Sequence, residues 1–204
     1  MRPRVEPYGK AVYLSPPQVK KLLNSIDQAS PLGARDYALI LGYILTARRN
    51  SELRKLRYGD ISHTADAVWY TWSGKGRKNQ RYELPEPVWQ AIKHYLTLSA
   101  RLASIRPQEY IFAPRGALGT SPLSSMEVGR RLKLYAAKSG LEEAKIHVHT
   151  LRHTGAMLRK QAGEDVVEIQ DDLGHSSLAV TSIYVKKIAG HRDSASDRVL
   201  SLIS

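Results

Sequence analysis

Apolar residues recur every three or four positions along much of this chain. Residues with that spacing share one face of a helix, whereas strict alternation is typical of a strand. Ser15 followed by Pro16 is a favourable helix start, because serine caps the first turn and proline fits the first helical position. The segment Ser-Pro-Leu-Gly (30–33) is expected to break the first helix. The pattern predicts helices over residues 16–26, 34–46, 51–56, 88–102, 125–139, 148–161 and 197–203.

Residues 67–84 depart from the helical period. The segments Ala-Val-Trp-Tyr-Thr-Trp (67–72) and Arg-Tyr-Glu-Leu (81–84) have the composition of two paired strands. The segment between them, Gly-Lys-Gly-Arg-Lys-Asn-Gln (74–80), is basic and contains glycine. It is too short, and lies in the wrong context, for a phosphate-binding P-loop. A flexible basic hairpin tip suits contact with a DNA backbone or groove.

Composition adds a strong positive charge. Lysine and arginine number 31 against 19 for aspartate and glutamate, which gives a net charge of +12 and a pI near 9.9. This excess favours a polyanionic partner, nucleic acid by default, although composition alone leaves a generically basic protein open. The chain has no cysteine, which excludes disulfides and thiolate chemistry. No apolar run has the length of a membrane span and no signal-peptide pattern is present, so we expect a cytoplasmic, nucleoid-associated protein.

The C-terminal third of the chain holds most of the candidate chemistry. On a helix over residues 148–161, His149, Arg152 and His153 share one face. Guanidinium groups bind phosphate oxygens bidentately, and imidazole can donate to an oxyanion or move a proton. The phenol of Tyr184 is a weak nucleophile that nearby cations would activate. Together these groups can attack a phosphodiester without a metal.

Simpler explanations exist for each of these residues taken alone. His175, in Leu-Gly-His-Ser-Ser, would more often be a capped-turn or core histidine, and Tyr184 an ordinary aromatic. His149 and His153 have the i, i+4 spacing of a zinc-binding pair. We expect no metal site there, because threonine rather than glutamate follows His149 and Arg152 would repel a cation.

The combination of motifs is more specific than any single residue. Residues 49–53, Arg-Asn-Ser-Glu-Leu, look like the first conserved box of the tyrosine recombinases, the phage integrase family, and Gly-Lys-Gly (74–76) resembles the hairpin that carries their mobile lysine. Three further phrases match the family's two C-terminal boxes: Thr-Leu-Arg-His-Thr-Gly-Ala (150–156), Asp-Asp-Leu-Gly-His-Ser-Ser (171–177) and Thr-Ser-Ile-Tyr (181–184). The resemblance covers about residues 12–190. It implies a catalytic-domain fold that is mainly α with a small antiparallel β-sheet.

The resemblance also implies a site-specific recombinase or integrase that needs no cofactor and no metal. Tyr184 would attack DNA and form a 3′-phosphotyrosyl link, while Lys75 would protonate the leaving 5′ oxygen. His149 would act as general acid/base and His175 would donate to the phosphate. The implied catalytic residues are Arg49, Lys75, His149, Arg152, His175 and Tyr184, with Glu52 and His153 in support.

One position departs from the family pattern. The family usually has glycine and a hydrophobic residue before the first arginine, and here the pair is Ala47-Arg48. This leaves Arg48 as a rival to Arg49. A helix in the place of residues 125–139 lies against DNA in the family. The candidate DNA contacts are Arg48, Arg77, Lys78, Arg130, Arg131 and Lys133.

The family also suggests domains and partners. The expected division is an N-terminal arm or linker (1–14), a catalytic domain (15–189) and a C-terminal tail (190–204), without the separate N-terminal DNA-clamping domain of many members. The tail is expected to dock in cis or in trans through Val199, Leu200 and Leu202. The implied partners are double-stranded DNA, further copies of the chain in a tetramer on DNA, and accessory DNA-bending proteins. No membrane partner is expected.

Three other functions stay open on the sequence alone. A type IB topoisomerase shares the chemistry, although its sequence around the tyrosine is typically different. A non-catalytic DNA-binding protein on the same fold would also be basic. A zinc hydrolase is a more distant alternative. Neither the DNA site nor the kind of genetic element can be derived from these motifs.

Overall fold

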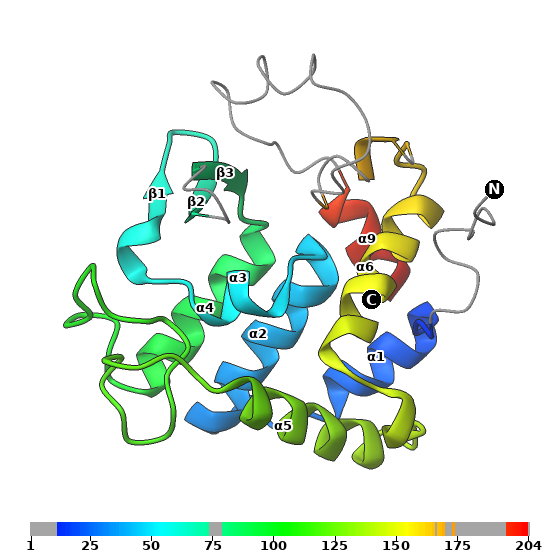
Figure 1. Cartoon of the computed structure of the whole chain (residues 1–204), viewed down its shortest axis with the longest axis horizontal. Coiled ribbons are helices and arrows are strands. Elements are labelled where there is room, and N and C mark those ends of the chain that lie inside the picture. Colours follow the sequence, from blue (N-terminus) through cyan, green and yellow to red (C-terminus); the bar gives the residue numbers. More distant parts are fainter. Residues whose placement is uncertain (1–11, 74–78, 166, 170–172, 174–194, 204) are drawn as a thin grey trace, which may run out of the picture.

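The computed structural model describes residues 12–73, 79–165, 167–169, 173 and 195–203. Helix α2 (Pro31–Thr46) lies at its centre, with 13 of its 16 residues buried. Most of its residues are apolar, so it can pack against neighbours on several sides. The helices that contact it are α1 (Pro16–Asn24), α3 (Asn50–Arg54), α4 (Glu86–Leu98), α5 (Ser125–Lys138), α6 (Val148–Gln161) and α9 (Ser196–Ile203), as Figure 1 shows.

Helix α2 begins earlier than its sequence pattern indicated. The side chain of Ser30 accepts a hydrogen bond from the backbone N–H of Gly33 at 3.1 Å, and Pro31 occupies the first helical position. The expected start at Ala34 is therefore wrong. A serine followed by proline was interpreted as a break, but the same pair is a favourable cap for the next helix.

The other helix predictions are confirmed with one further correction. Helices α1, α3, α5, α6 and α9 begin and end within about two residues of the expected positions, which is the ordinary uncertainty of helix ends. Helix α4 ends at Leu98, not at Leu102 as expected. Ala100 has a left-handed backbone, with φ of 55°, and this turn takes the chain away from the helix axis.

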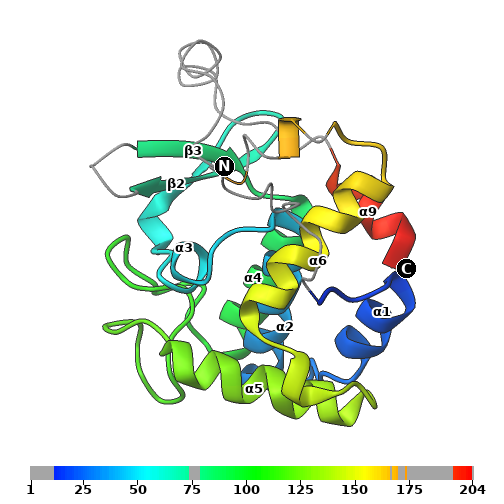
Figure 2. The same ribbon diagram turned by 45° about the vertical axis from the view of Figure 1, so that its right-hand side comes forward.

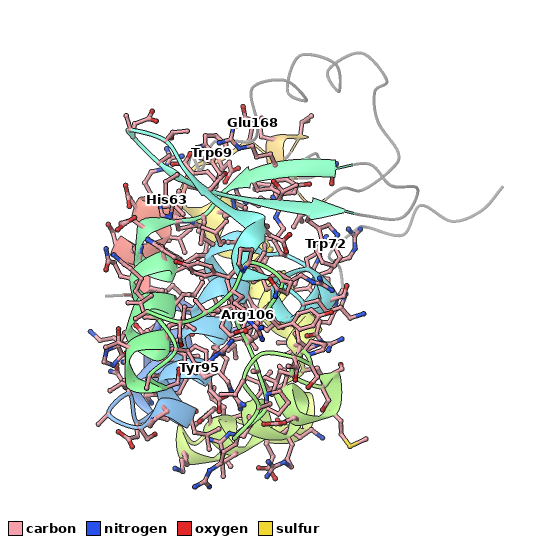
Figure 3. The ribbon with its side chains drawn as sticks, turned by 90° about the vertical axis from the view of Figure 1, so that its left-hand side faces the viewer. His63, Trp69, Trp72, Tyr95, Arg106 and Glu168 are labelled. Carbon is pink, nitrogen blue, oxygen red and sulfur yellow. The ribbon has the colours of Figure 1, made fainter. Side chains whose placement is uncertain are left out.

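Three antiparallel strands form one sheet in the order β1 (Ile61–His63), β2 (Val68–Ser73), β3 (Asn79–Glu83). The predicted hairpin is confirmed, with Tyr70 opposite Tyr82. Strand β1 was not predicted, because three residues are too few to show alternation. Figure 3 shows the sheet at one end of the helical body. Two short 3₁₀ turns complete the described elements, η1 (Tyr58–Asp60) and η2 (Glu143–Lys145).

Helix α6 packs against α2 at a position that requires glycine. A Cβ added to Gly155 would lie 2.3 Å from the backbone oxygen of Ile44 and 3.0 Å from the Cβ of Ala47. Any larger side chain would push the two helices apart. The close approach, visible where α6 crosses α2 in Figure 2, brings the N-terminal half of α6 beside the C-terminal end of α2.

The C-terminal helix α9 docks on the chain's own core. It contacts α1, α2 and α6, and it lies beside α6 in both Figure 1 and Figure 2. Val199 is fully buried and Ile203 is buried, and Leu200 packs against the core. Leu202 is 39% exposed. In this arrangement Ile203, rather than the expected Leu202, anchors the tail.

Candidate active site

A pocket of about 580 Å³ opens where several helices meet, and we call it the arginine pocket. The turn after α2, helix α3 and the N-terminal ends of α5 and α6 all contribute to it. None of its described lining residues is acidic, and three of its arginines lie within seven residues of one another. The pocket therefore attracts anions. Its lining residues are Arg48, Arg49, Asn50, Ser51, Arg54, Ser125, Val148, His149 and Arg152.

Two adjacent arginines directly after α2 have different environments. Ala47 caps the helix in the left-handed conformation, with φ of 50° and ψ of 27°. This region favours glycine, so Ala47 stands where the family pattern has glycine. Arg48 is 5% exposed and its guanidinium lies 3.5 Å from the centre of the Tyr82 ring. The side chain of Arg49 is instead 53% exposed and is the better placed of the two to meet a ligand.

The carboxylate of Glu52 contacts both the backbone and the side chain of Arg49. It accepts a hydrogen bond from the backbone N–H of Arg49 at 3.3 Å, and it lies 3.2 Å from Nη1 of the same residue. Glu52 is 5% exposed. A buried carboxylate paired with an exposed guanidinium restricts the orientation of that guanidinium without covering it. The family resemblance implied a supporting role for Glu52, and the structure places its carboxylate against Arg49.

Arg152 is fixed by two backbone carbonyls. Its Nη1 donates to the oxygen of Ala47 and its Nη2 donates to the oxygen of Leu173, each at 2.8 Å. The side chain is 6% exposed yet lines the arginine pocket. The carbonyls orient the guanidinium without neutralising its charge. Arg152 thereby links the turn that presents Arg49 to the residue two positions before His175.

His149 lies in the first turn of α6 and lines the arginine pocket. Its ring contacts that of His153 edge-to-face, with 4.4 Å between ring centres. Burial lowers the pKa of the His149 imidazole below its ordinary value of 6.5, and the nearby charges of Arg152 and Arg49 lower it further. At neutral pH the ring is therefore uncharged and can accept a proton. The predicted common face of His149, Arg152 and His153 is present, although Arg152 is the most buried of the three.

Some polar residues of the pocket lie outside the candidates that the sequence motifs indicated. Nδ2 of Asn50 donates to Oγ of Ser125 at 2.8 Å, which ties α3 to the first turn of α5. Arg54 donates to the backbone oxygen of Leu123. The polar residues at 50 and 125 lie far apart in sequence, so no local pattern could have paired them.

The candidate DNA contacts on α5 fall into two groups. Arg130 and Lys133 are exposed to solvent. Arg131 points toward α2, where its Nε lies 2.6 Å from the carboxylate of Asp36, and it also donates to the hydroxyl of Tyr135. Its side chain is only 15% exposed. Arg131 therefore holds α5 on α2, and this contact is the role that the structure shows for it.

Five candidate residues lie outside the described part of the chain. They are Lys75, Arg77, Lys78, His175 and Tyr184. Within the described part, no group of three or more histidine, cysteine, aspartate or glutamate side chains is arranged to hold a metal ion. In the same part of the chain, no helix has the length and apolar character needed to cross a membrane.

Comparison with known proteins decides the family. The family model described as "Phage integrase family" matches residues 13–191, which is most of the chain. This chain belongs to the phage integrase family. The mainly α fold with a small antiparallel sheet is that of the family's tyrosine recombinase catalytic domains, as expected.

Several curated members of the phage integrase family are similar to this chain. The tyrosine recombinase XerA of Pyrococcus furiosus is 34% identical over 185 residues, which cover 91% of this chain and 60% of the relative. The tyrosine recombinase of Pseudothermotoga lettingae is 30% identical over 188 residues, covering 92% of this chain and 60% of the relative. XerC of Neisseria meningitidis is 34% identical over 161 residues, or 79% of this chain and 50% of the relative. The chain thus spans between half and 60% of these relatives.

Solved structures of the family have the same fold. The XerH site-specific recombinase bound to its difH substrate matches with a TM-score of 0.68 at 25% identity, over 85% of this chain and 50% of that one. The XerA recombinase matches with a TM-score of 0.65 at 25% identity, over 98% of this chain and 67% of that one.

Proposed function

We propose that this chain is the catalytic part of a site-specific DNA recombinase that cleaves and rejoins DNA through a 3′-phosphotyrosyl intermediate. The observation that carries the proposal is the arginine pocket, in which Arg49, Arg152 and a neutral His149 converge. Two fixed guanidinium groups can stabilise the charge on a phosphodiester under attack, and a proton acceptor can activate the nucleophile, so no metal is required. Membership of the phage integrase family supports the same conclusion.

The two arginines stabilise the charge of the transition state. Arg49 and Arg152 contact the non-bridging oxygens of the phosphate, where negative charge accumulates as the fifth bond to phosphorus forms. Each such fixed donor typically contributes about 3–4 kcal/mol to lowering the barrier. The carbonyls of Ala47 and Leu173 hold Arg152, and Glu52 holds Arg49, so little reorganisation is needed during the reaction.

The remaining steps use residues that the family motifs supply. The oxygen of Tyr184 attacks phosphorus, and its proton passes to His149. The bond from phosphorus to the 5′ oxygen breaks, and Lys75 protonates that oxygen, while His175 donates to the phosphate. In rejoining, the 5′-hydroxyl of another strand attacks phosphorus and gives its proton to Lys75. The bond from phosphorus to Tyr184 breaks, and His149 returns a proton to the phenol oxygen.

The proposed partners follow from this reaction. Recombination joins two DNA duplexes and thus needs several protomers, and we assign a tetramer on DNA, with accessory DNA-bending proteins as further candidates. Arg130 and Lys133 on α5, and Arg77 and Lys78 in the hairpin tip, contact the DNA backbone or grooves. An enzyme with these partners works in the cytoplasm at the nucleoid.

The test is covalent trapping in EDTA. Nicked duplexes are tiled across the DNA that flanks the protein's own gene and incubated with the protein, beside Tyr184→Phe. We expect a slow-migrating protein–DNA band on a denaturing gel, absent in the Tyr184→Phe lane. Salt-sensitive DNA binding without any band would contradict a cleaving enzyme and favour a DNA-binding protein. Relaxation of plasmids without sequence preference would favour a topoisomerase.

A further inference from the structure

A second hollow, which we call the distal cavity, lies at the other end of α2 from the arginine pocket. Its volume of about 410 Å³ falls within the ~300–1,000 Å³ typical of small-molecule sites. Helix α2 has 16 residues, so its two ends are roughly 24 Å apart. The distal cavity and the arginine pocket share no lining residue. A molecule in the distal cavity would therefore not occupy the phosphate site.

The walls of the distal cavity are both apolar and cationic. Leu32 at the start of α2, the ring of Tyr95 on α4 (labelled in Figure 3) and Leu118 in the loop before α5 supply apolar surface. Leu118 is 72% exposed, so a bound molecule can cover its side chain. Three arginines also line the cavity: Arg35, Arg101 and Arg115. None of the described lining residues is acidic.

Besides the lining, the buried side chain of Arg101 points to an anionic ligand. It is 5% exposed, and its Nη1 and Nη2 donate to the backbone oxygens of Ile111 and Tyr110, at 2.9 and 2.7 Å. Its Nε is buried and has no hydrogen-bond partner among the described residues. A buried donor without an acceptor is unfavourable, and more so when the group is charged. The buried guanidinium therefore places a positive charge under the cavity wall, with Glu109 3.9 Å away.

The charge balance around the cavity is positive. Arg35 is neutralised by Asp36 and Glu127, at 2.8 and 3.0 Å. Arg101 has only a share of Glu109, which lies 3.9 Å from it and 2.7 Å from Arg106. The hydrogen bond from Arg106 lowers the pKa of the Glu109 carboxyl, so one carboxylate faces two guanidinium groups.

The cavity wall is held in place before any ligand arrives. Besides the bonds from Arg101, Nη1 of Arg35 donates to the backbone oxygen of Ala113 at 2.9 Å. Gly119 approaches Arg101 so closely that a Cβ there would lie 2.4 Å from Nη2. Two buried arginines thus fix the segment from Tyr110 to Ala113. A site that is already formed loses little entropy when it binds a ligand.

We infer that the distal cavity binds a small organic anion, with a carboxylate or phosphate next to an apolar body. The anionic group accepts from the exposed Arg115 and is attracted by the charge of the buried Arg101. Both lie near the N-terminal end of α2, where the helix dipole is positive. The apolar body packs between Leu32 and Leu118. This ligand binds at a site separate from DNA.

The test compares a carboxylate with its neutral amide in the full chain. Titration of 1-naphthoate, followed by the ¹H–¹³C methyl signals of Ala117 and Leu118, should give saturable shifts. 1-Naphthamide, which has the same shape without charge, should bind at least ~10-fold more weakly, because it loses charge-assisted hydrogen bonds. Inorganic phosphate, which lacks the apolar body, should also bind more weakly than naphthoate.

Three variants localise the binding. Ala117→Trp should fill the cavity and abolish the shifts, and Arg115→Glu should weaken naphthoate binding at least ~10-fold. Lys138→Glu makes the same charge change on an exposed residue outside the cavity and should leave binding unchanged. Equal binding of naphthamide, equal loss of binding in Lys138→Glu, or the absence of any shift with naphthoate would each overturn the inference. A dispersed methyl spectrum checks that each variant is folded.

Discussion

Neighbouring residues in the arginine pocket have opposite environments. Arg48 turns inward over Tyr82, whereas Arg49 turns outward above Glu52. Both follow the left-handed turn at Ala47, where the chain changes direction at the end of α2. The sequence motif selected Arg49 but left Arg48 as a rival. The structure favours the motif's choice, since the guanidinium of Arg48 lies over the Tyr82 ring whereas that of Arg49 is exposed beside the pocket.

The lowered pKa of His149 predicts the pH dependence of cleavage. An imidazole must be neutral to accept the proton of Tyr184, and burial and two arginines keep His149 neutral down to a pH below about 6.5. We expect the rate of cleavage at subsaturating DNA to be level from about pH 7 upward and to fall as pH drops below about 6.5. His149→Gln should slow cleavage and remove this fall. An acid limb that persists unchanged in His149→Gln would assign the titration to another group.

At the scale of elements, the contact between α2 and α6 shapes the site. Gly155 lets the two helices approach, and this approach places Arg152 within 2.8 Å of the Ala47 oxygen. The distance between α2 and α6 therefore sets the separation of Arg152 from Arg49.

Two glycine-to-alanine changes should act in opposite directions. Gly155→Ala places a methyl group against the backbone of α2 and should destabilise the protein by about 1–3 kcal/mol, lowering Tm by roughly 2–12 °C. It should also slow cleavage, because Arg152 moves. Gly129→Ala on α5 meets open space and should be neutral or stabilising by up to about 1 kcal/mol. Thermal unfolding measures both, and a higher Tm for Gly155→Ala would refute the close packing.

The sequence predicted elements better than contacts. Periodicity located α6 to the residue, and the motifs indicated Arg49, Glu52, His149 and Arg152, which the structure brings to one pocket or its support. It did not predict the Asn50–Ser125 bond, because that contact depends on how α3 and α5 pack. It also grouped Arg131 with the DNA contacts, since a basic residue on a surface helix looks exposed until its acidic partner on another helix is known.

At the scale of the whole molecule, the lysine and arginine side chains behind the net charge of +12 are of two kinds. Some are exposed to solvent, and others form ion pairs that stabilise the fold. Arg130 belongs to the first kind, and Arg131, paired with Asp36, to the second. Only the first kind releases counterions when DNA binds, so the charge count alone overstates the electrostatic contribution.

This division predicts different results for two adjacent arginines. Arg130→Ala should weaken DNA binding and reduce the slope of log K against log salt concentration by about 0.9, the value for one phosphate contact. Arg131→Ala should leave that slope unchanged and instead lower Tm, because Asp36 loses a buried partner. Binding measured by fluorescence anisotropy over a salt series tests both. The same slope change in both variants would show that Arg131 also reaches DNA.

The central claim is that Arg49 stabilises negative charge on the scissile phosphate. The most direct measurement is single-turnover cleavage of a DNA in which a methylphosphonate replaces that phosphate, because the methyl group removes the charge of one non-bridging oxygen. On ordinary DNA, Arg49→Ala should cleave at least ~10²-fold more slowly than the unmodified protein. On methylphosphonate DNA the two proteins should differ far less, since the charge that Arg49 stabilises is gone. An equal loss on both substrates would contradict this role.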